Sequence, residues 1–423
     1  MSLSELNETD KKILSTIRKN PYCKKSKIAD LSDISWTTAV NAIDRLMSFK
    51  MISITSGDSA LEKNLLHVNN SFGYFIGVSV GSSHIKVCVL DFAFSTVKYS
   101  DFLGFFDDNS VFKNTFWVKN HLKQSDSELA LWCTNTYIAN NNTLAHIKSI
   151  VDGIGRMALE LSEGTNKVLL IGFSFPGHID NKNNVIIKSS NLDLNLNNVS
   201  PNTLFTSELL YKIQEKGISI YFEHNVKAAA VAEKVIGRIQ DINHNCAVLY
   251  LGAGLGVTFL LNGMLYRGDT NAAGQIGHVK VERKTHYKCT CGSESCLEQY
   301  LREIFEVPTE ELDPNDKIYV KDSSGNQLAD WLNKKDHILK REEFVKCISR
   351  VLFNLSDLLE INTFVFTGKL GELYTDLESL FQEQMILNNK ATINIVSTES
   401  GEYSASKGTA ICGYYHLIDY SLL

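Results

Sequence analysis

The sequence predicts an α/β fold preceded by a small domain of three helices and a hairpin. From Tyr74 onward, alternating strands and fully apolar strands follow one another with helical stretches between them. Before Tyr74, three short runs with helical spacing precede two short alternating runs. Hydrophobic residues make up 44% of the 423 residues, so each domain can bury a core.

The N-terminal region contains the three helical runs. Ile13, Leu14 and Ile17 fall at helical spacing after a polar capping stretch, and Asn20-Pro21 ends this run. Ser35 is the expected N-cap of the third helix. Helices are expected at residues 7–19, 26–31 and 36–49, and strands at 51–55 and 65–68. Three helices followed by a hairpin indicate a winged helix-turn-helix.

The remainder of the chain alternates strands with helices. The segment 74–91 reads as two strands joined at Gly81-Ser82-Ser83, and a second glycine-rich turn joins two later strands. This pairing of glycine turns indicates two similar halves. Further strands are expected at 168–175, 218–222, 246–250, 258–261, 364–366 and 393–396, with a helix at 226–236. Residues 104–145 show no clear pattern.

Composition limits the possible functions. The net charge is −6, yet residues 1–70 contain 10 Lys or Arg and 8 Asp or Glu, a net charge of +2. This asymmetry favours an N-terminal nucleic-acid-binding module. No apolar run of about 18 residues predicts a membrane span, and the N-terminus lacks the apolar core of a signal peptide. The nine cysteines do not resemble a secreted disulfide framework, so we expect a cytoplasmic protein with reduced thiols.

Three cysteines are clustered and suggest a metal site. Cys289, Cys291 and Cys296 lie within eight residues, and His278 lies eleven residues before the first of them. Three thiolates and one imidazole make a closed tetrahedral set suited to structural Zn²⁺. His286 is a competing fourth ligand, and three ordinary reduced cysteines in a loop are the alternative. The cluster predicts a structural zinc site.

These residues also carry a resemblance to a known family. GQIGHVKV followed by CTCGSESCLEQY resembles the signature of the ROK family (repressors, open reading frames and sugar kinases), which runs roughly G-E-x-G-H and then C-x-C-G-x-x-G-C-L-E. Gln275 replaces the Glu and Ser295 replaces one Gly, whereas all the zinc positions match. Other segments are similar in the same order: FSFPGHIDNKNNVIIKSSNLDL, EHNVKAAAVAE, LGAGLGVTFLLNGMLYRG, FVFTGKLG and SASKGTAICGYYH.

The resemblance covers most of residues 74–415 and implies an actin-like (ribonuclease H-like), two-lobed, sugar-kinase-type domain. Together with an N-terminal winged helix it implies the repressor branch of the family. The expected domains are a winged helix-turn-helix at 1–70, an N-terminal lobe at 71–190, and a C-terminal lobe with the zinc site at 191–423.

Comparison with the family's kinases implies that this chain is not an enzyme. Phosphoryl transfer needs a carboxylate to accept the proton of the sugar hydroxyl. The kinases carry E-N-D-x-N-A-A where this sequence reads EHNVKAAA, so the general-base Asp falls on Asn225 and the following Asn on Lys227. The acidic residue of the first phosphate loop falls on Ser79. The glycines of LGAGLG remain, either to cradle an anion or to form a tight turn.

The resemblance also implies a sugar site. Amides, carboxylates and imidazoles form paired hydrogen bonds with adjacent sugar hydroxyls. The implied contacts are His224, Asn225, Gln275, His278, Glu298, Asn191 and Gly177. Relative to the family pattern, amides replace carboxylates at Asn225 and Gln275. This exchange fits an altered ligand or a sugar derivative with negative charge, and the alternative is a cleft that binds no ligand.

The helix at 36–49 is the expected recognition helix, whose first residues meet base edges in the major groove. Asn and Arg side chains suit bases, Thr suits phosphates or the thymine methyl, and lysines near the preceding helix suit phosphates. The candidates are Lys24, Lys25, Lys27, Trp36, Thr37, Thr38, Asn41 and Arg45. Trp36 either contacts DNA or fills the core between helices. A helical dimerisation module is the alternative for the whole domain.

The sequence thus predicts a transcriptional regulator, a repressor of carbohydrate-metabolism genes that binds a double-stranded DNA operator. A sugar or sugar derivative in a catalytically inactive ROK domain would change its DNA affinity. We expect a homodimer or homotetramer. An active sugar kinase with a DNA-binding appendage and a regulator controlled by a protein partner are the alternatives.

Overall fold

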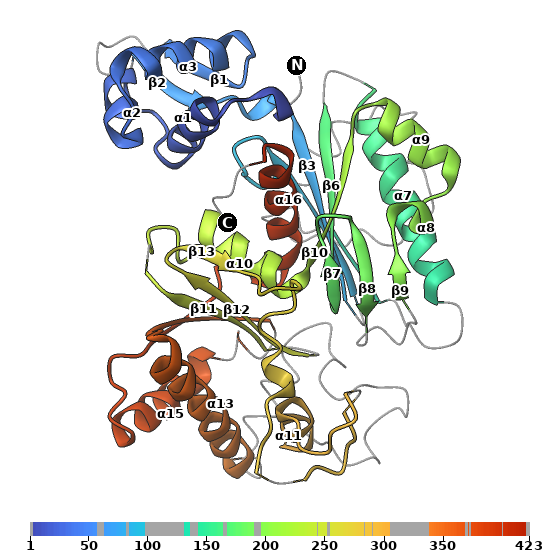
Figure 1. Ribbon diagram of the computed structural model, residues 1–423, viewed down its shortest axis with the longest axis vertical. Coiled ribbons are helices and arrows are strands. Elements are labelled where there is room, and N and C mark those ends of the chain that lie inside the picture. Colours follow the sequence, from blue (N-terminus) through green and yellow to red (C-terminus); the bar gives the residue numbers. More distant parts are fainter. Residues whose placement is uncertain are drawn as a thin grey trace.

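The computed structural model describes residues 3–56, 63–81, 84–97, 131–135, 143–163, 167–189, 196–242, 244–251, 254–282, 284–289, 291–304, 338–368, 371, 374–399 and 401–419. Figure 1 shows the N-terminal domain at one end of the molecule, followed by a lobe built around β3, β6 and β10 and a second lobe built around β11 and β12. The described part of the chain therefore has three parts.

The N-terminal domain has the predicted three helices and hairpin. Helix α1 begins with a capping box, because Asn7 Oδ1 accepts the N–H of Asp10 and the Asp10 carboxylate accepts the N–H of Asn7. Ser35 caps α3 by accepting the N–H of Thr38. The elements are η1 (Leu3–Glu5), α1 (Glu8–Lys19), α2 (Lys25–Ser32), α3 (Trp36–Ser48), the antiparallel strands β1 (Ile52–Ser56) and β2 (Lys63–Val68), and η2 (Asn70–Phe72).

The first lobe contains a five-stranded sheet in the order β5-β4-β3-β6-β10. Strands β3, β6 and β10 are parallel, whereas β4 pairs antiparallel with both β3 and β5. All eight residues of β6 are buried, as expected for a strand covered on both faces. The strands are β3 (Tyr74–Val80), β4 (His84–Asp91), β5 (Leu131–Asn135), β6 (Val168–Phe175) and β10 (Ser219–His224).

Helices and a small sheet complete this lobe. Helices α7 (Thr143–Leu161), α8 (Pro201–Leu204) and α9 (Ser207–Glu215) lie on one side of the five-stranded sheet (Figure 1). A three-stranded antiparallel sheet consists of β7 (His178–Asp180), β8 (Val185–Ser189) and β9 (Leu196–Val199).

The second lobe repeats the arrangement of the first. Its sheet has the order β13-β12-β11-β14-β15, with β11, β14 and β15 parallel and β12 antiparallel to both β11 and β13. The two similar halves expected from the glycine turns are therefore present. The elements are β11 (Cys246–Leu251), β12 (Leu255–Leu261), β13 (Met264–Tyr266), η3 (Ile276–His278), α11 (Leu297–Ile304), α13 (Ile338–Leu359), β14 (Thr363–Thr367), α15 (Tyr374–Leu387) and β15 (Asn394–Ser397).

Two helices lie between the lobes. Helix α16 (Ser404–Leu417), preceded by η6 (Gly401–Tyr403), packs on the first sheet, and α10 (Asn225–Ile236) packs on both α16 and the second sheet (Figure 1). The two helices approach closely at Gly408, where an added Cβ would lie 1.7 Å from the carbonyl oxygen of Ala228. Glycine is required there because any side chain would separate the helices.

The predicted lobe boundary after residue 190 does not match the division between the two sheets. Strand β10 pairs with β6 in the first sheet, although residues 219–224 follow that boundary. The C-terminal α16 also packs on β3 and β6. The physical reason is that a parallel strand needs a long crossover, so the first lobe takes residues from distant parts of the chain.

The N-terminal domain docks on the first lobe through Arg18 of α1. The guanidinium carbon of Arg18 lies 4.1 Å from the ring centroid of Phe94 and 4.5 Å from that of Tyr414 in α16. Lys11 of the same helix donates a hydrogen bond of 3.2 Å to the carbonyl oxygen of Asp419. A continuous group of buried apolar side chains extends across this junction.

Candidate ligand cleft, metal centre and DNA-binding helix

A cavity of about 430 Å³ lies between the lobes. It is lined by the β6–β7 turn, β8, the start of α10, the β11–β12 turn, and the segment that follows β13. This volume is in the range of small-molecule sites. Of the residues predicted to bind a sugar, the cavity brings together Gly177, His224, Asn225, Gln275, His278 and Glu298. Asn191 lies outside the described residues.

The start of α10 forms one wall of the cleft. His224 is the N-cap, and its Nδ1 accepts the N–H of Val226 at 3.3 Å. Asn225, which the family resemblance matches to the kinases' general base, is the first residue of the helix. Burial lowers the pKa of His224 to about 4, so its imidazole is neutral at pH 7 and a weak base. This wall therefore offers neither a carboxylate nor an effective base.

The glycine-rich turns form another part of the wall. Gly81, Gly254 and Gly256 line the cavity, whereas Gly252, Ser82 and Ser83 lie outside the described residues. Glu298 Oε2 accepts the backbone N–H of Leu255 at 3.1 Å, so this carboxylate holds the β11–β12 turn in place. Ser79 lies within β3, and no acidic side chain stands at its position.

The segment after β13 is held across the cleft by a buried ion pair that the sequence analysis missed. Arg267 Nη1 donates to Glu223 Oε2 at 2.8 Å, and the hydroxyl of Tyr221 donates to the same oxygen at 2.9 Å. Burial raises the pKa of Glu223, but the Arg267 guanidinium and other donors outweigh this effect, so the pKa lies below its ordinary value. This pair joins β10 of the first lobe to the second lobe.

Lys227, noted only as a departure from the kinase pattern, also lines the cavity. Its side chain is 2% exposed, and Nζ donates to the carbonyl oxygen of Asn271. Burial lowers the pKa of Lys227 to about 8, although the nearby Glu223 carboxylate favours its charged form. The lysine is therefore a buried cation at the base of the cleft.

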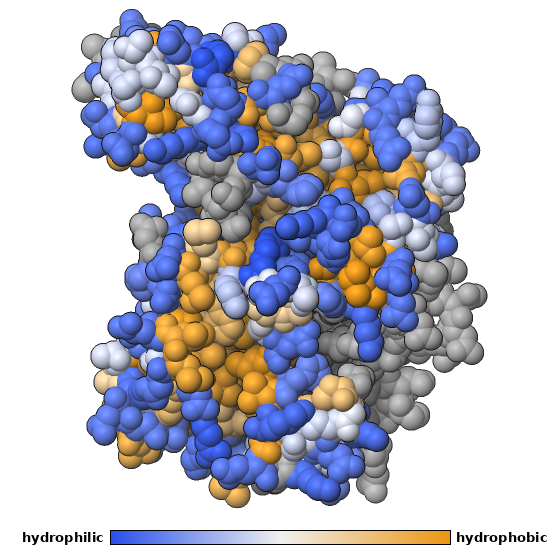
Figure 2. Space-filling model, viewed as in Figure 1, coloured by the Kyte–Doolittle hydropathy of each residue, from blue (hydrophilic) through white to orange (hydrophobic). Residues whose placement is uncertain are grey.

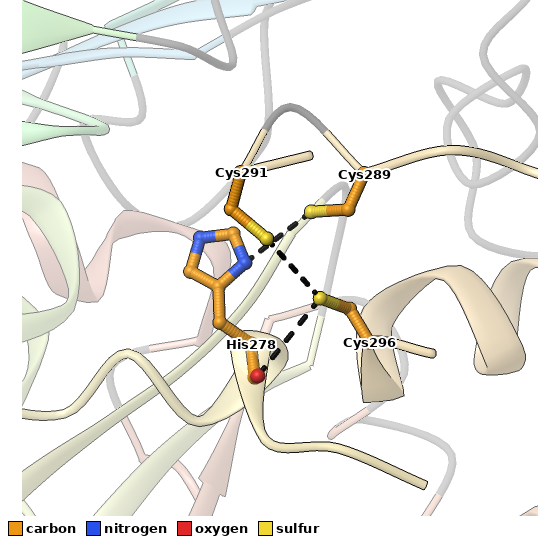
Figure 3. A group of neighbouring side chains, drawn as sticks. All are labelled: His278, Cys289, Cys291 and Cys296. Carbon is orange, nitrogen blue, oxygen red and sulfur yellow. Dashed lines mark hydrogen bonds between the residues drawn. The ribbon is translucent and has the colours of Figure 1, made fainter. Parts of the chain in front are cut away.

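The predicted metal ligands converge at one point (Figure 3). The ligand atoms of His278, Cys289, Cys291 and Cys296 all lie within 4.8 Å of one another. Cys289 Sγ lies 3.3 Å from His278 Nδ1, and Cys291 Sγ lies 3.4 Å from Cys296 Sγ. Bonds of about 2.3 Å to a tetrahedral zinc would place two sulfurs roughly 3.7 Å apart. This donor set therefore fits a tetrahedral zinc ion.

The surroundings of the cluster affect its sulfurs differently. Lys280 Nζ donates to Cys296 Sγ at 3.0 Å. The N–H of Ser293 and the thiol of Cys296 lower the pKa of Cys291 to about 7, whereas burial raises the pKa of Cys289 to about 11. A bound dication would favour the thiolate form of both.

His286, the competing fourth ligand, does not join the cluster. Its side chain is 91% exposed, and its Nδ1 lies 3.2 Å from the Glu303 carboxylate. The set is completed by His278, which comes from η3 and also lines the cleft. Cys291 lines the cleft as well, so the metal centre and the cleft share two residues.

The first turns of α3 present exposed side chains. Trp36, Thr37, Thr38 and Asn41 are all exposed, and Trp36 is 55% exposed, which rules out a role in filling the core between helices. The N-terminal domain shows a mostly hydrophilic surface in Figure 2, whereas hydrophobic residues gather over the second lobe. Lys24 and Lys27 are exposed, while Lys25 Nζ lies 2.8 Å from an Asp44 oxygen. The tip of the wing, residues 57–62, lies outside the described residues.

Arg45, predicted to contact bases, is engaged within the domain. Its Nε and Nη2 donate to Asp10 Oδ1 at 3.1 and 2.6 Å, and the Asp10 side chain is 3% exposed. Helical spacing placed Arg45 on the outer side of α3, but the buried carboxylate of α1 draws the guanidinium inward. In this structure Arg45 therefore joins α1 to α3, and its contact with bases stays a prediction.

Comparisons with known proteins place these features in a family. Residues 133–413 match the model of the ROK family, and residues 6–48 match a model described as winged helix-turn-helix DNA-binding. None of the described helices is long and apolar enough to cross a membrane.

Similar proteins include both repressors and kinases. The xylose repressor of Bacillus subtilis (strain 168) is 23% identical over 298 residues, which are 69% of this chain and 65% of the repressor. The match therefore spans about 65% of that relative's length. A glucokinase of Streptomyces coelicolor is 25% identical over 154 residues, 36% of this chain and 44% of the glucokinase.

Solved structures have the same fold. A ROK family transcriptional regulator, a homolog of the E. coli MLC protein, has a TM-score of 0.66 at 15% identity, covering 98% of both chains. A ROK family glucokinase from Streptomyces griseus, in complex with glucose and AMPPNP, has a TM-score of 0.55 at 18% identity, covering 80% of this chain and 99% of the glucokinase. The family model covers more than half of the sequence, and the chain belongs to the ROK family.

Proposed function

We propose that this chain is a DNA-binding transcriptional regulator, a repressor of carbohydrate-metabolism genes, controlled by a sugar or sugar derivative bound in its cleft. The observation that carries the proposal is the combination of an exposed α3 start in a winged helix-turn-helix with a ROK cleft that has Asn225 at its catalytic position. The similarity to xylose repressors supports it.

In the proposed DNA complex, α3 enters the major groove of a double-stranded operator. Thr37, Thr38, Asn41 and Trp36 then meet the DNA first, because they are exposed at the start of the helix. The exposed Lys24 and Lys27 lie near phosphates. Lys25 contacts a phosphate after its ion pair with Asp44 breaks. A homodimer or homotetramer would place two such helices on two half-sites.

Replacing Asn41 by alanine is expected to weaken operator binding by about 1–3 kcal/mol, because an amide can form two hydrogen bonds with an adenine edge. The operator is first selected from a random DNA library with the full chain. Binding is then measured by fluorescence anisotropy at fixed salt. Asn202→Ala, an exposed residue of α8 in the first lobe, is the matched control. Equal affinity of the two variants would remove Asn41 from the interface.

In the proposed ligand complex, the sugar lies in the cleft between the lobes. Asn225, Gln275 and His224 offer hydrogen-bonding groups without charge. Glu298 and Gly177 shape the wall, and Asn191 is included from the family resemblance. Zn²⁺ would be held by Cys289, Cys291, Cys296 and His278, and a metal bonded to Nδ1 leaves the other ring nitrogen of His278 for a hydroxyl.

No phosphoryl transfer is expected. With Asn225 in place of a carboxylate and a neutral His224 beside it, the start of α10 offers no group that accepts the hydroxyl proton efficiently. Incubation with ATP–Mg²⁺ and a panel of sugars, followed by mass spectrometry, should yield no sugar phosphate. Turnover of any sugar would replace this proposal with that of an active kinase. Release of DNA in the presence of a sugar, without turnover of that sugar, would support the proposed function. Release of DNA only in the presence of another protein would indicate control by a protein partner.

A further inference from the structure

The base of the cleft carries excess positive charge. Lys227, which is 2% exposed, lines the cavity, and behind it lie the Glu223 carboxylate, which is 0% exposed, and the Arg267 guanidinium, whose side chain is 27% exposed. Tyr221 and His224 are neutral at pH 7, because burial raises the pKa of the first and lowers that of the second. One carboxylate therefore faces two cations in this group.

The rest of the cavity wall does not restore the balance. Glu298 is the one acidic residue among the described residues that line the cavity, and its Oε2 accepts the N–H of Leu255. Lys188 of β8, which is exposed, lines the same cavity and adds a further cation. Buried charge is costly without a partner of opposite sign, so the cleft favours an anion.

The helix that enters the cleft adds to this preference. Helix α10 has twelve residues, and its first residues, Asn225, Val226 and Lys227, all line the cavity. The amino end of a helix carries a partial positive charge, which remains at α10 although His224 Nδ1 accepts the N–H of Val226. The helix end, Lys227 and Lys188 therefore all contribute positive charge to the same cavity.

We propose that the cleft binds a sugar derivative with an anionic group, held at the start of α10 by Lys227 and Lys188. This inference rests on the proposed function, since it specifies the effector of the same cleft. A phosphate ester and a carboxylate share the chemistry that these lysines recognise. The sugar hydroxyls meet the uncharged amides of Asn225 and Gln275.

The proposal is tested by calorimetry on the full zinc-loaded chain. Neutral glucose, xylose and N-acetylglucosamine are each compared with their phosphate esters, and glucuronate and xylonate are the carboxylates. We expect at least one anionic derivative to bind about ten-fold or more tightly than its neutral parent. If the phosphate esters and the carboxylates bind with different affinities, the tighter class identifies the anionic group that the cleft recognises. Inorganic phosphate shows whether the anion alone suffices.

Two variants locate the anion. Lys188→Met and Lys227→Met are each expected to weaken binding of the anionic derivative by about ten-fold and to weaken binding of the neutral parent much less. Lys188 is exposed, so its replacement leaves the fold intact even where Lys227→Met does not. Lys182→Met, in the exposed turn before β8, is the matched control and should change neither affinity.

The outcomes separate this inference from the proposed function. A neutral sugar that binds as tightly as its anionic derivatives and releases DNA would overturn the inference and leave the proposed function standing. Inorganic phosphate binding as tightly as a sugar phosphate would overturn the requirement for a sugar. An absence of binding by every sugar would overturn both.

Discussion

Replacing Arg267 by methionine should lower the free energy of unfolding by about 3–5 kcal/mol. The substitution leaves the Glu223 carboxylate, which is 0% exposed, without the guanidinium that neutralises it at 2.8 Å. Lys227 compensates in part, so the loss should fall near the lower end of that range. Urea unfolding of the full chain, followed by tryptophan fluorescence, measures the effect.

The control for this prediction is an exposed ion pair. Arg238→Met removes a guanidinium that lies 3.7 Å from Glu399, with both side chains more than half exposed, and should cost less than about 1 kcal/mol. Adding Glu223→Gln to Arg267→Met should recover much of the loss, because the buried charge disappears with its partner. Equal effects of Arg267→Met and Arg238→Met would contradict the assigned role of the buried pair.

Replacing Cys296 by serine is expected to abolish metal binding and to unfold the segment between η3 and α11. The thiol is 0% exposed and its Sγ lies 3.4 Å from that of Cys291, so its loss opens the tetrahedral set. Structural zinc contributes about 10–16 kcal/mol in small zinc-finger peptides, and a sizeable part of this should be lost here. Metal content by mass spectrometry and proteolysis of the segment 279–296 measure the two effects.

Cys23→Ser is the control for the metal prediction. Cys23 is half-buried in the N-terminal domain and lies outside the cluster, so this variant should keep one zinc per chain. A chelator should reproduce the effects of Cys296→Ser in the wild-type chain and produce no further change in the variant. Purified wild-type protein without zinc, or a Cys296→Ser variant that retains it, would contradict a structural zinc site.

Features encoded locally were predictable from the sequence. The N-caps Asn7 and Ser35 fix the starts of α1 and α3, because the cap and its partners lie within three residues. The metal cluster was also predictable, since three of its four ligands lie within eight residues. Short separations of this kind leave little freedom for alternative partners.

Features that depend on distant partners were not predictable. Glu223 and Arg267 are 44 residues apart and lie on different lobes, and the one local signal was an acidic residue at the end of an apolar strand. Arg45 has helical spacing typical of an outward-facing residue, yet Asp10, 35 residues earlier, binds it. In both cases the packing of the elements determines the partner. The spacing of residues along one element gives no information about that packing.

The docking of α1 on the end of the chain has a consequence for biosynthesis. Lys11 and Asp419, which form a hydrogen bond, are 408 residues apart, and Arg18 lies against Tyr414 of α16. Ribosomes make the N-terminal domain first, and such domains generally fold as units during synthesis. Phe94 follows soon afterwards, but the part of the docking surface that α16 contributes is made much later. A nascent chain therefore carries a folded helix-turn-helix on a free tether, and it acquires its fixed orientation only after the ribosome releases α16.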